Sequence, residues 1–394
     1  MESLLKFAPR PNGAGEMFQL LRDGVPRTRS ELATITGQAR STIAARIEVL
    51  SKADLIVTVG EATSTGGRRP ATFAFNPAAR VVLGIDLGAA HARIGVTDLA
   101  ANLLATHDSP LDIADGPEAV LSAVTEHAAA LLAQVNHGVH TLAAIGIGLP
   151  GPVEHKTGRP VAPPIMPGWD GYDVAGYLRK EFNVPVLVDN DVNLMAVGEH
   201  RTAWNDHDNL MFVKVATGIG SGIILDGQLR RGAQGAAGDI GHIAVSGRSE
   251  AACTCGNHGC LEAVAGGAAL ARVLTAQGFH APHVSDVVQA VRDGNAEARV
   301  AVREAGRSIG GVLAGCVSML NPSVVVVGGA MVAAGEQLMA GIREVLYRRS
   351  LPLATQHLRV VTSQTKEKAG VLGGAFLAID HVLSPAAIDL LYSN

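Results

Sequence analysis

Apolar residues recur at helical spacing three times near the start of the chain. This pattern predicts helices over residues 16–22, 28–37 and 40–52. Thr28 stands three residues before Glu31, which is the spacing of a capping box and marks the start of the second helix. In the third helix Ile43, Ile47 and Leu50 repeat at i, i+4 and i+7 and should face a core. Because a turn of three or four residues separates the last two helices, we expect a helix-turn-helix.

Two short apolar segments follow this unit and predict strands over residues 55–59 and 71–75. The sequence Gly-Gly-Arg-Arg-Pro at 66–70 lies between them and predicts a wing. Exposed polar side chains on the third helix and on the wing are the candidate DNA contacts. They are Arg40, Ser41, Thr42 and Arg46 on the helix, and Arg68 and Arg69 on the wing. The alternative is an interaction module whose arginines are only solvated.

Ala39 departs from the pattern of a recognition helix. It precedes the third helix, where such a helix normally has a Ser or Thr cap. An alanine side chain cannot accept a hydrogen bond from the first turn, so the missing cap should cost the helix about 1 kcal/mol.

After residue 80 the apolar pattern alternates between strand and helix, and it does so twice. Strands are predicted at 81–86, 92–96 and 102–106, followed by a helix at 117–135 and a strand at 142–147. A similar order begins again with strands at 210–217 and 222–225 and ends with a strand at 324–327. We therefore expect a DNA-binding domain at 1–78 and an α/β body at 79–394, with two lobes and a cleft near 189–193 and 236–262.

Charge separates the head from the body. The first 80 residues contain 11 Lys and Arg against 7 Asp and Glu; subtraction from the totals of 32 and 36 leaves 21 against 29 in the rest. A basic head on an acidic body favours an anionic partner, here operator DNA. One helix-turn-helix reads only a few base pairs, so we expect a homodimer or homotetramer.

Composition places the chain among globular proteins of the cytoplasm. Hydrophobic residues make up 47% and charged residues 17% of the chain, which excludes a disordered protein. No apolar run approaches the roughly 20 residues needed to span a bilayer, and residues 1–10 lack the pattern of a signal peptide. We therefore expect a cytoplasmic protein without a membrane partner.

Three of the four cysteines are crowded into eight residues. Cys253, Cys255 and Cys260 have the spacing of metal ligands, whereas a disulfide framework would need partners spread along the chain. A nearby imidazole would complete a tetrahedral, structural zinc site with no open position, one zinc per chain. His258 inside the loop is one candidate for this imidazole. Three free thiols are the alternative.

Several motifs of the body resemble a known family. Asp86-x-Gly88 resembles the first phosphate loop of the actin-like ATPase fold. The stretches D-N-D-V-N (189–193), A-T-G-I-G-S-G-I-I (216–224), G-D-I-G-H (238–242) and C-T-C-G-N-H-G-C-L-E (253–262) resemble the ROK family of sugar kinases and repressors. The resemblance covers essentially the whole chain. It implies a winged helix-turn-helix followed by a two-lobed actin-like ATPase (ribonuclease H-like) sugar-kinase fold.

The resemblance also implies the residues of a sugar site. They are Asn190, Asp191, Asp239, His242 and Glu262, with Asp191 in the position of the kinases' catalytic base. It makes His242 the fourth zinc ligand beside Cys253, Cys255 and Cys260. The alternative for residues 189–193 is that they only cap the following helix. Trp169 is either an apolar wall beside the sugar or part of the core.

Two departures from the ROK kinases bear on function. The chain has Gly88-Ala89-Ala90 where the kinases have G-G-T, and Asp239 where they have Glu. The first change adds methyl groups where backbone must approach phosphate. We therefore expect a non-enzymatic, sugar-responsive transcriptional regulator that represses carbohydrate uptake or catabolism genes and binds a sugar or sugar phosphate. The alternatives are an ATP-dependent sugar kinase with an accessory head, and a constitutive DNA-binding protein with a vestigial body.

Overall fold

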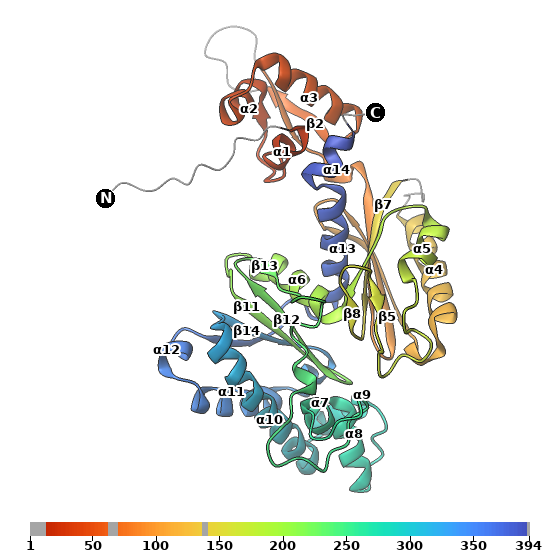
Figure 1. Ribbon diagram of the computed structural model, residues 1–394, viewed down its shortest axis with the longest axis vertical. Helices are drawn as coiled ribbons and strands as arrows, with labels where there is room; N and C mark the ends of the chain where they lie inside the picture. Colours follow the sequence, from red (N-terminus) through yellow and green to blue (C-terminus); the bar gives the residue numbers. More distant parts are fainter. Residues whose placement is uncertain (1–12, 62–69, 136–140, 392–394) are drawn as a thin grey trace.

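The computed structural model describes residues 13–61, 70–135 and 141–391. In Figure 1 these residues form a small head at one end of the molecule and two α/β lobes beyond it. The candidate wing residues Arg68 and Arg69 lie outside the described residues. None of the helices in the described ranges is both long enough and apolar enough to cross a membrane.

The head is built from three helices and a small sheet. These are α1 (Ala14–Gln19), α2 (Arg29–Thr36), α3 (Arg40–Lys52), β1 (Arg27–Thr28), β2 (Ile56–Glu61) and β3 (Ala71–Phe75), with the strands in the order β1-β3-β2. Thr28 and Glu31 form the predicted capping box at the start of α2. At Ala39 no side chain caps α3, again as predicted. The apolar face of α3 is buried in the head.

The first lobe contains a five-stranded sheet with helices against it. Its elements are β4 (Val81–Leu87), β5 (His91–Asp98), β6 (Leu103–Pro110), α4 (Pro117–Gln134), β7 (Leu142–Leu149), β8 (Val153–Glu154), β9 (Arg159–Pro160), α5 (Val174–Phe182) and β10 (Val186–Asn190). The strand order is β10-β7-β4-β5-β6, and β8 pairs separately with β9. The central strand β4 is buried along its whole length, because helices cover both faces of the sheet there.

The second lobe repeats this topology, as the sequence predicted. Its strands are β11 (Leu210–Val215), β12 (Ile219–Leu225), β13 (Gln228–Leu229), β14 (Val324–Gly328) and β15 (Arg359–Thr362), in the order β13-β12-β11-β14-β15. The helices are α7 (Leu261–Ala265), α8 (Gly267–Ala276), α9 (Val284–Arg292), α10 (Ala296–Leu320), α11 (Glu336–Arg349) and α12 (Pro352–Thr355). In both sheets an antiparallel hairpin precedes two strands that join in parallel.

Two helices cross where the lobes meet. These are α6 (Asp191–Ala203) and α13 (Ala369–Val382). Their backbones approach so closely that a Cβ atom on Gly198 would stand 2.0 Å from the carbonyl oxygen of Ala369. A Cβ atom on Gly373 would likewise meet the carbonyl oxygen of Leu194 at 1.8 Å. Glycine at both positions therefore lets the helices pack at backbone distance.

The C-terminal segment packs against the head. In Figure 1 α13 runs from between the lobes towards the head, where α14 (Pro385–Leu390) lies beside α1. The backbone N–H of Gly15 donates to Asp389 Oδ1 at 2.8 Å, and Gln19 Nε2 donates to the carbonyl of Leu383 at 2.7 Å. Ile388 is buried in the same apolar cluster as Phe18 and the buried residues of α3. The head and the end of the chain therefore share one core.

Candidate functional site

Asn190 and Asp191 lie at the start of α6, directly after β10. The side-chain Oδ1 of Asn190 accepts from the backbone N–H groups of Val192 at 3.0 Å and Asn193 at 3.3 Å, so this residue caps the helix. Its Nδ2 atom donates to the carbonyl of Gly151 at 3.0 Å. Asn190 therefore caps α6, and Asp191 Oδ1 also accepts from the N–H of Val192 at 2.7 Å, but both side chains have partners outside this helix.

Asp191 is buried and forms an ion pair with Lys214, which projects from β11 in the second lobe. Burial raises the pKa of the Asp191 carboxyl, and the positive charge of Lys214 only partly opposes this rise. Burial alone would lower the pKa of Lys214, but attraction to Asp191 and Asp86 outweighs it and the pKa is raised. The lysine is therefore a cation at neutral pH.

Asp189 joins the two lobes through a second ion pair. Its Oδ2 atom accepts from Arg231 Nε at 2.6 Å, and its Oδ1 atom accepts from Asn193 Nδ2 at 2.9 Å. Arg231 follows β13 in the second lobe. Neither Lys214 nor Arg231 was identified from the sequence. The only signal for Lys214 is one charged residue inside the apolar run at 210–215.

Asp239, His242 and Glu262 form a second group in the second lobe. Glu262 Oε2 accepts from the backbone N–H of Ile219 at 3.1 Å. Asp239 Oδ1 lies 4.0 Å from His242 Nε2. The segment 217–222 lies between this group and α6, because a Cβ atom on Gly220 would contact Val192 at 3.1 Å. The five predicted sugar ligands thus lie on both sides of one glycine-rich loop.

His242 and the three clustered cysteines converge on one point. Ala244 pairs with Cys260 across an antiparallel bridge, which brings His242 beside the cysteine loop. The four ligand atoms all lie within 4.8 Å of one another, with 3.7 Å between His242 Nδ1 and Cys253 Sγ and 3.8 Å between the Sγ atoms of Cys255 and Cys260. Four thiolate or imidazole ligands around zinc would be spaced by about 3.8 Å, the edge of a tetrahedron with 2.3 Å bonds. The residues therefore fit a tetrahedral metal ion.

The chemistry of the donors agrees with this fit. A backbone N–H from Asn257 lowers the pKa of Cys255 to about 7, whereas burial raises the pKa of Cys260 to about 12. Coordination requires thiolates, so a metal ion would have to displace the proton of Cys260. His258 is exposed and lies outside the cluster. His242 uses Nδ1 towards the cysteines and turns Nε2 towards Asp239.

The side chains of α3 differ in exposure. Arg40 and Ser41 are exposed, while Thr42 and Arg46 are half-buried. Arg46 donates a hydrogen bond to the side-chain oxygen of Gln38 in the preceding turn. Arg40 and Ser41 are thus the most accessible of the four predicted helix contacts.

Comparison with known proteins identifies the family. The ROK family profile matches residues 82–381. The chain belongs to the ROK family. It is 29% identical to the xylose repressor of Caldicellulosiruptor bescii over 371 residues, which are 91% of this chain and 92% of that protein. A crystal structure of a ROK family transcriptional regulator, a homologue of the E. coli MLC protein, has a TM-score of 0.80 at 25% identity and covers 96% of this chain and 97% of its own. The ROK glucokinase of Streptomyces griseus, solved with glucose and AMPPNP, has a TM-score of 0.66 at 30% identity and covers 75% of this chain and 98% of its own.

In this ROK protein the His91 ring lies against Gly88, in the loop whose sequence resembles a phosphate loop. A Cβ atom on Gly88 would stand 2.1 Å from the imidazole Cε1 of His91, whose Nε2 atom lies 3.8 Å from Asp86 Oδ2. The carbonyls of Ala89 and Ala90 accept backbone hydrogen bonds from the segment 111–113. These two carbonyl groups of the loop therefore already have hydrogen-bond partners within the chain. Sequence reasoning identified the two alanines but not His91.

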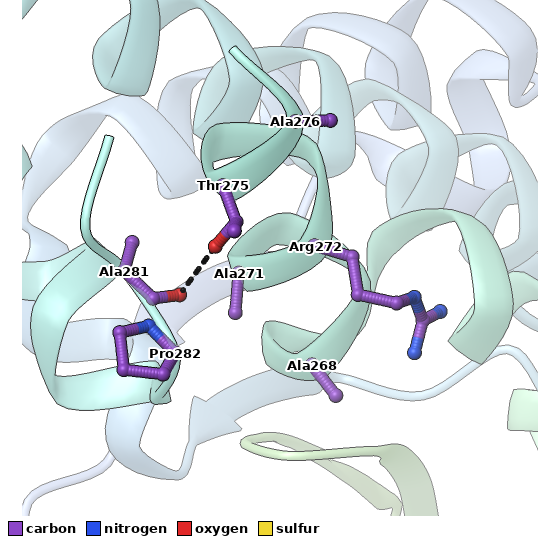
Figure 2. A pocket seen from close by; sticks show the side chains of 7 residues that line it. All are labelled: Ala268, Ala271, Arg272, Thr275, Ala276, Ala281 and Pro282. Carbon is purple, nitrogen blue, oxygen red and sulfur yellow. Dashed lines mark hydrogen bonds between the residues drawn. The ribbon is translucent and has the colours of Figure 1, made fainter. Parts of the chain in front are cut away.

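Two other features of this ROK protein lie apart from the ligand groups. Trp169 is fully buried and donates from Nε1 to the carbonyl of Ile113 at 3.0 Å, so it belongs to the core of the first lobe. A cavity of about 530 Å³ lies against α8 and the segment that precedes α9 (Figure 2). Alanines, Thr275, Pro282 and Arg272 line it, and it contains no carboxylate to accept from sugar hydroxyls.

Proposed function

We propose that this ROK protein is a sugar-responsive transcriptional repressor of carbohydrate uptake or catabolism genes. The observation that carries the proposal is the extent of the similarity. The xylose repressor of C. bescii matches 91% of the chain, and the transcriptional regulator matches 96%, whereas the S. griseus glucokinase covers 75%. The family match begins at residue 82, after the head. A chain that carries the head in addition to the kinase-like body is therefore the repressor type.

The head is, in this proposal, a winged helix-turn-helix that binds operator DNA. Residues 1–78 are the DNA-binding domain and residues 79–394 the effector-binding domain. The exposure of Arg40 and Ser41 on α3 supports major-groove contacts, because Arg can bond base edges and Ser can bond phosphate. Thr42 and Arg46 add contacts from the same helix, and Arg68 and Arg69 contact the minor groove. A homodimer or homotetramer supplies the second half-site.

The body binds a sugar or sugar phosphate, with xylose as the first candidate because the relatives are named xylose repressors. Carboxylates and an imidazole suit a polyol, since each can accept hydrogen bonds from hydroxyl groups. The proposed ligands are Asn190, Asp191, Asp239, His242 and Glu262. One structural zinc, held by His242, Cys253, Cys255 and Cys260, fixes the His242 ring so that Nε2 faces the sugar.

The body binds its sugar without phosphorylating it. Phosphoryl transfer depends on backbone donors and metal ions that hold the nucleotide in line. Here Ala89 and Ala90 replace the smaller or hydroxyl-bearing residues of the kinases, and the His91 ring lies over Gly88. Sugar binding requires none of these positions. It can shift operator affinity if one arrangement of the two lobes binds the sugar more tightly.

An operator titration tests the proposal. An operator is first selected from random duplex DNA with the full-length protein, and its affinity is then measured by fluorescence anisotropy with and without a panel of sugars and sugar phosphates. We expect one sugar to lower operator affinity. Arg40→Ala should weaken operator binding by about 1–3 kcal/mol. Arg348→Ala is the matched control, because Arg348 is exposed on α11 of the body, away from the head.

The same sugars are assayed for ADP release from ATP. Sugar-dependent turnover at about 1–100 per second, the usual range of kinases, would contradict the binding role and favour the kinase alternative. Equal operator affinity of the wild-type protein and Arg40→Ala, together with no response to any sugar, would refute the repressor function.

A further inference from the structure

Lys214 occupies an unusual position for a lysine. It lies on the central strand β11 between two buried valines, and only 15% of its side chain is exposed. Its ammonium group forms an ion pair with Asp191 of α6, at the junction of the lobes. A buried lysine is costly to desolvate, so it is found where a fixed positive charge is needed.

A second buried carboxylate belongs to the same cluster. Asp86 on β4 of the first lobe is 3% exposed, and its Oδ1 atom has no hydrogen-bond partner among the described residues. Burial would raise the pKa of Asp86, but the His91 imidazole 3.8 Å away and the charge of Lys214 outweigh burial and lower it. Asp86 and Asp191 therefore both lie beside Lys214, and Asp86 also lies near His91, which contacts Arg93 at 3.1 Å.

One or two carboxylates are the usual protein ligands of Mg²⁺ in phosphoryl-transfer sites, where the ion also binds the nucleotide phosphates. An ammonium group supplies positive charge and hydrogen-bond donors but no open coordination positions for phosphate. A covalently attached cation is also present whether or not a nucleotide is bound.

We propose that Lys214 is a built-in cation that replaces the divalent metal ion between Asp86 and Asp191 and holds the Asp191 carboxylate in position for an effector hydroxyl. Lys214 is thus a positioning residue, and the sugar binds without Mg²⁺ or nucleotide. The inference rests on the proposed function, because it assigns how the same site binds its effector.

Glu262 makes a further contact between a carboxylate of the site and the chain's own backbone. On the other glycine loop, a Cβ atom on Gly218 would stand 1.9 Å from Glu262 Oε2, which accepts from the N–H of Ile219. In this structure the N–H of Ile219 therefore already has a partner within the chain.

The test compares the wild-type protein with Lys214→Met, which keeps the length of the side chain and removes its charge. Mg²⁺ alone is titrated by calorimetry, and xylose-induced release of the operator is measured in EDTA and in Mg²⁺. We expect the wild-type protein to bind no Mg²⁺ and to respond to xylose equally in both buffers. Lys214→Met should bind Mg²⁺, and its response to xylose in EDTA should weaken by about 10-fold or more. Lys214→Arg should keep the response and bind no Mg²⁺.

Lys180→Met is the matched control, because Lys180 is exposed on α5 and the substitution is the same. Binding of Mg²⁺ by the wild-type protein, or a xylose response that requires Mg²⁺, would overturn the proposal even if Lys214→Met failed to fold. A folded Lys214→Met variant with wild-type response in EDTA and no Mg²⁺ binding would overturn it as well. If no sugar releases operator from the wild-type protein, the proposed function fails instead, and the Mg²⁺ titrations still decide the role of Lys214.

Discussion

Ile388 provides a direct way to separate the head from the body. This residue lies on α14, is 1% exposed and packs in the cluster that contains Phe18 and Leu55 of the head. Ile388→Ala would remove most of the apolar contact that α14 makes with the head. Ile388 belongs to neither of the two large clusters that fill the lobes, although its own cluster also contains Val82 of β4 and Ala144 of β7.

The structure limits the size of the effect. Replacement of a buried isoleucine by alanine costs about 2–5 kcal/mol. A cavity of about 150 Å³, lined partly by Ile388 and Leu55, already exists at this junction, so fewer contacts are lost than in a fully packed core. We therefore expect the lower part of the range, about 2–3 kcal/mol. That loss raises the population of molecules with an opened head by about 30- to 140-fold.

Hydrogen exchange measured by mass spectrometry reports this population directly. Amides of α3 should exchange about 30- to 140-fold faster in Ile388→Ala, while amides of β14 should exchange at the wild-type rate. Leu390→Ala is the control on the same helix, since Leu390 is 66% exposed and should change neither rate. Equal acceleration in α3 and β14, or no acceleration in α3, would show that α14 does not hold the head.

Three further outcomes are expected. Ala39→Ser should stabilise the head by about 1 kcal/mol, seen as slower exchange in α3, because serine supplies the missing cap; no change would mean that this helix end is already satisfied. Cys255→Ser should lose zinc by elemental analysis and melt at a lower temperature, and a full complement of zinc would contradict the assigned ligands. Asp191→Asn should weaken the sugar response by about 10- to 150-fold with operator affinity retained, whereas an unchanged response would remove Asp191 from the site.

Local patterns of the sequence were enough to predict much of the fold. The helix at 40–52 has the predicted bounds, because its apolar repeat lies within four turns of one segment. The strand predicted from residue 222 begins instead at Ile219. Residues Gly220 to Gly222 of this strand resemble a loop in composition. They are small because α6 packs against them, and a Cβ atom on Gly222 would meet Ala196 Cβ at 2.5 Å.

The candidate site also has a part that the sequence predicted and a part that it did not. The cysteine cluster could be predicted because its thiols lie within one loop, and the ROK resemblance added His242. The ion pairs of Asp191 with Lys214 and of Asp189 with Arg231 join residues 23 and 42 positions apart on different lobes. No local spacing encodes such pairs, because they depend on how the two sheets are placed around α6.

The core that the head shares with α14 also determines when the head can finish folding during synthesis. Residues 13–75 leave the ribosome first, yet Ile388 and Leu383, which complete their core, are translated more than 300 residues later. At about 5–20 residues per second, that delay is about 15–60 s. Throughout this interval the nascent head lacks part of its apolar packing. A ribosome that stops early therefore releases a chain whose head cannot complete its core. We expect full operator binding only from chains that also contain the folded sugar-binding body.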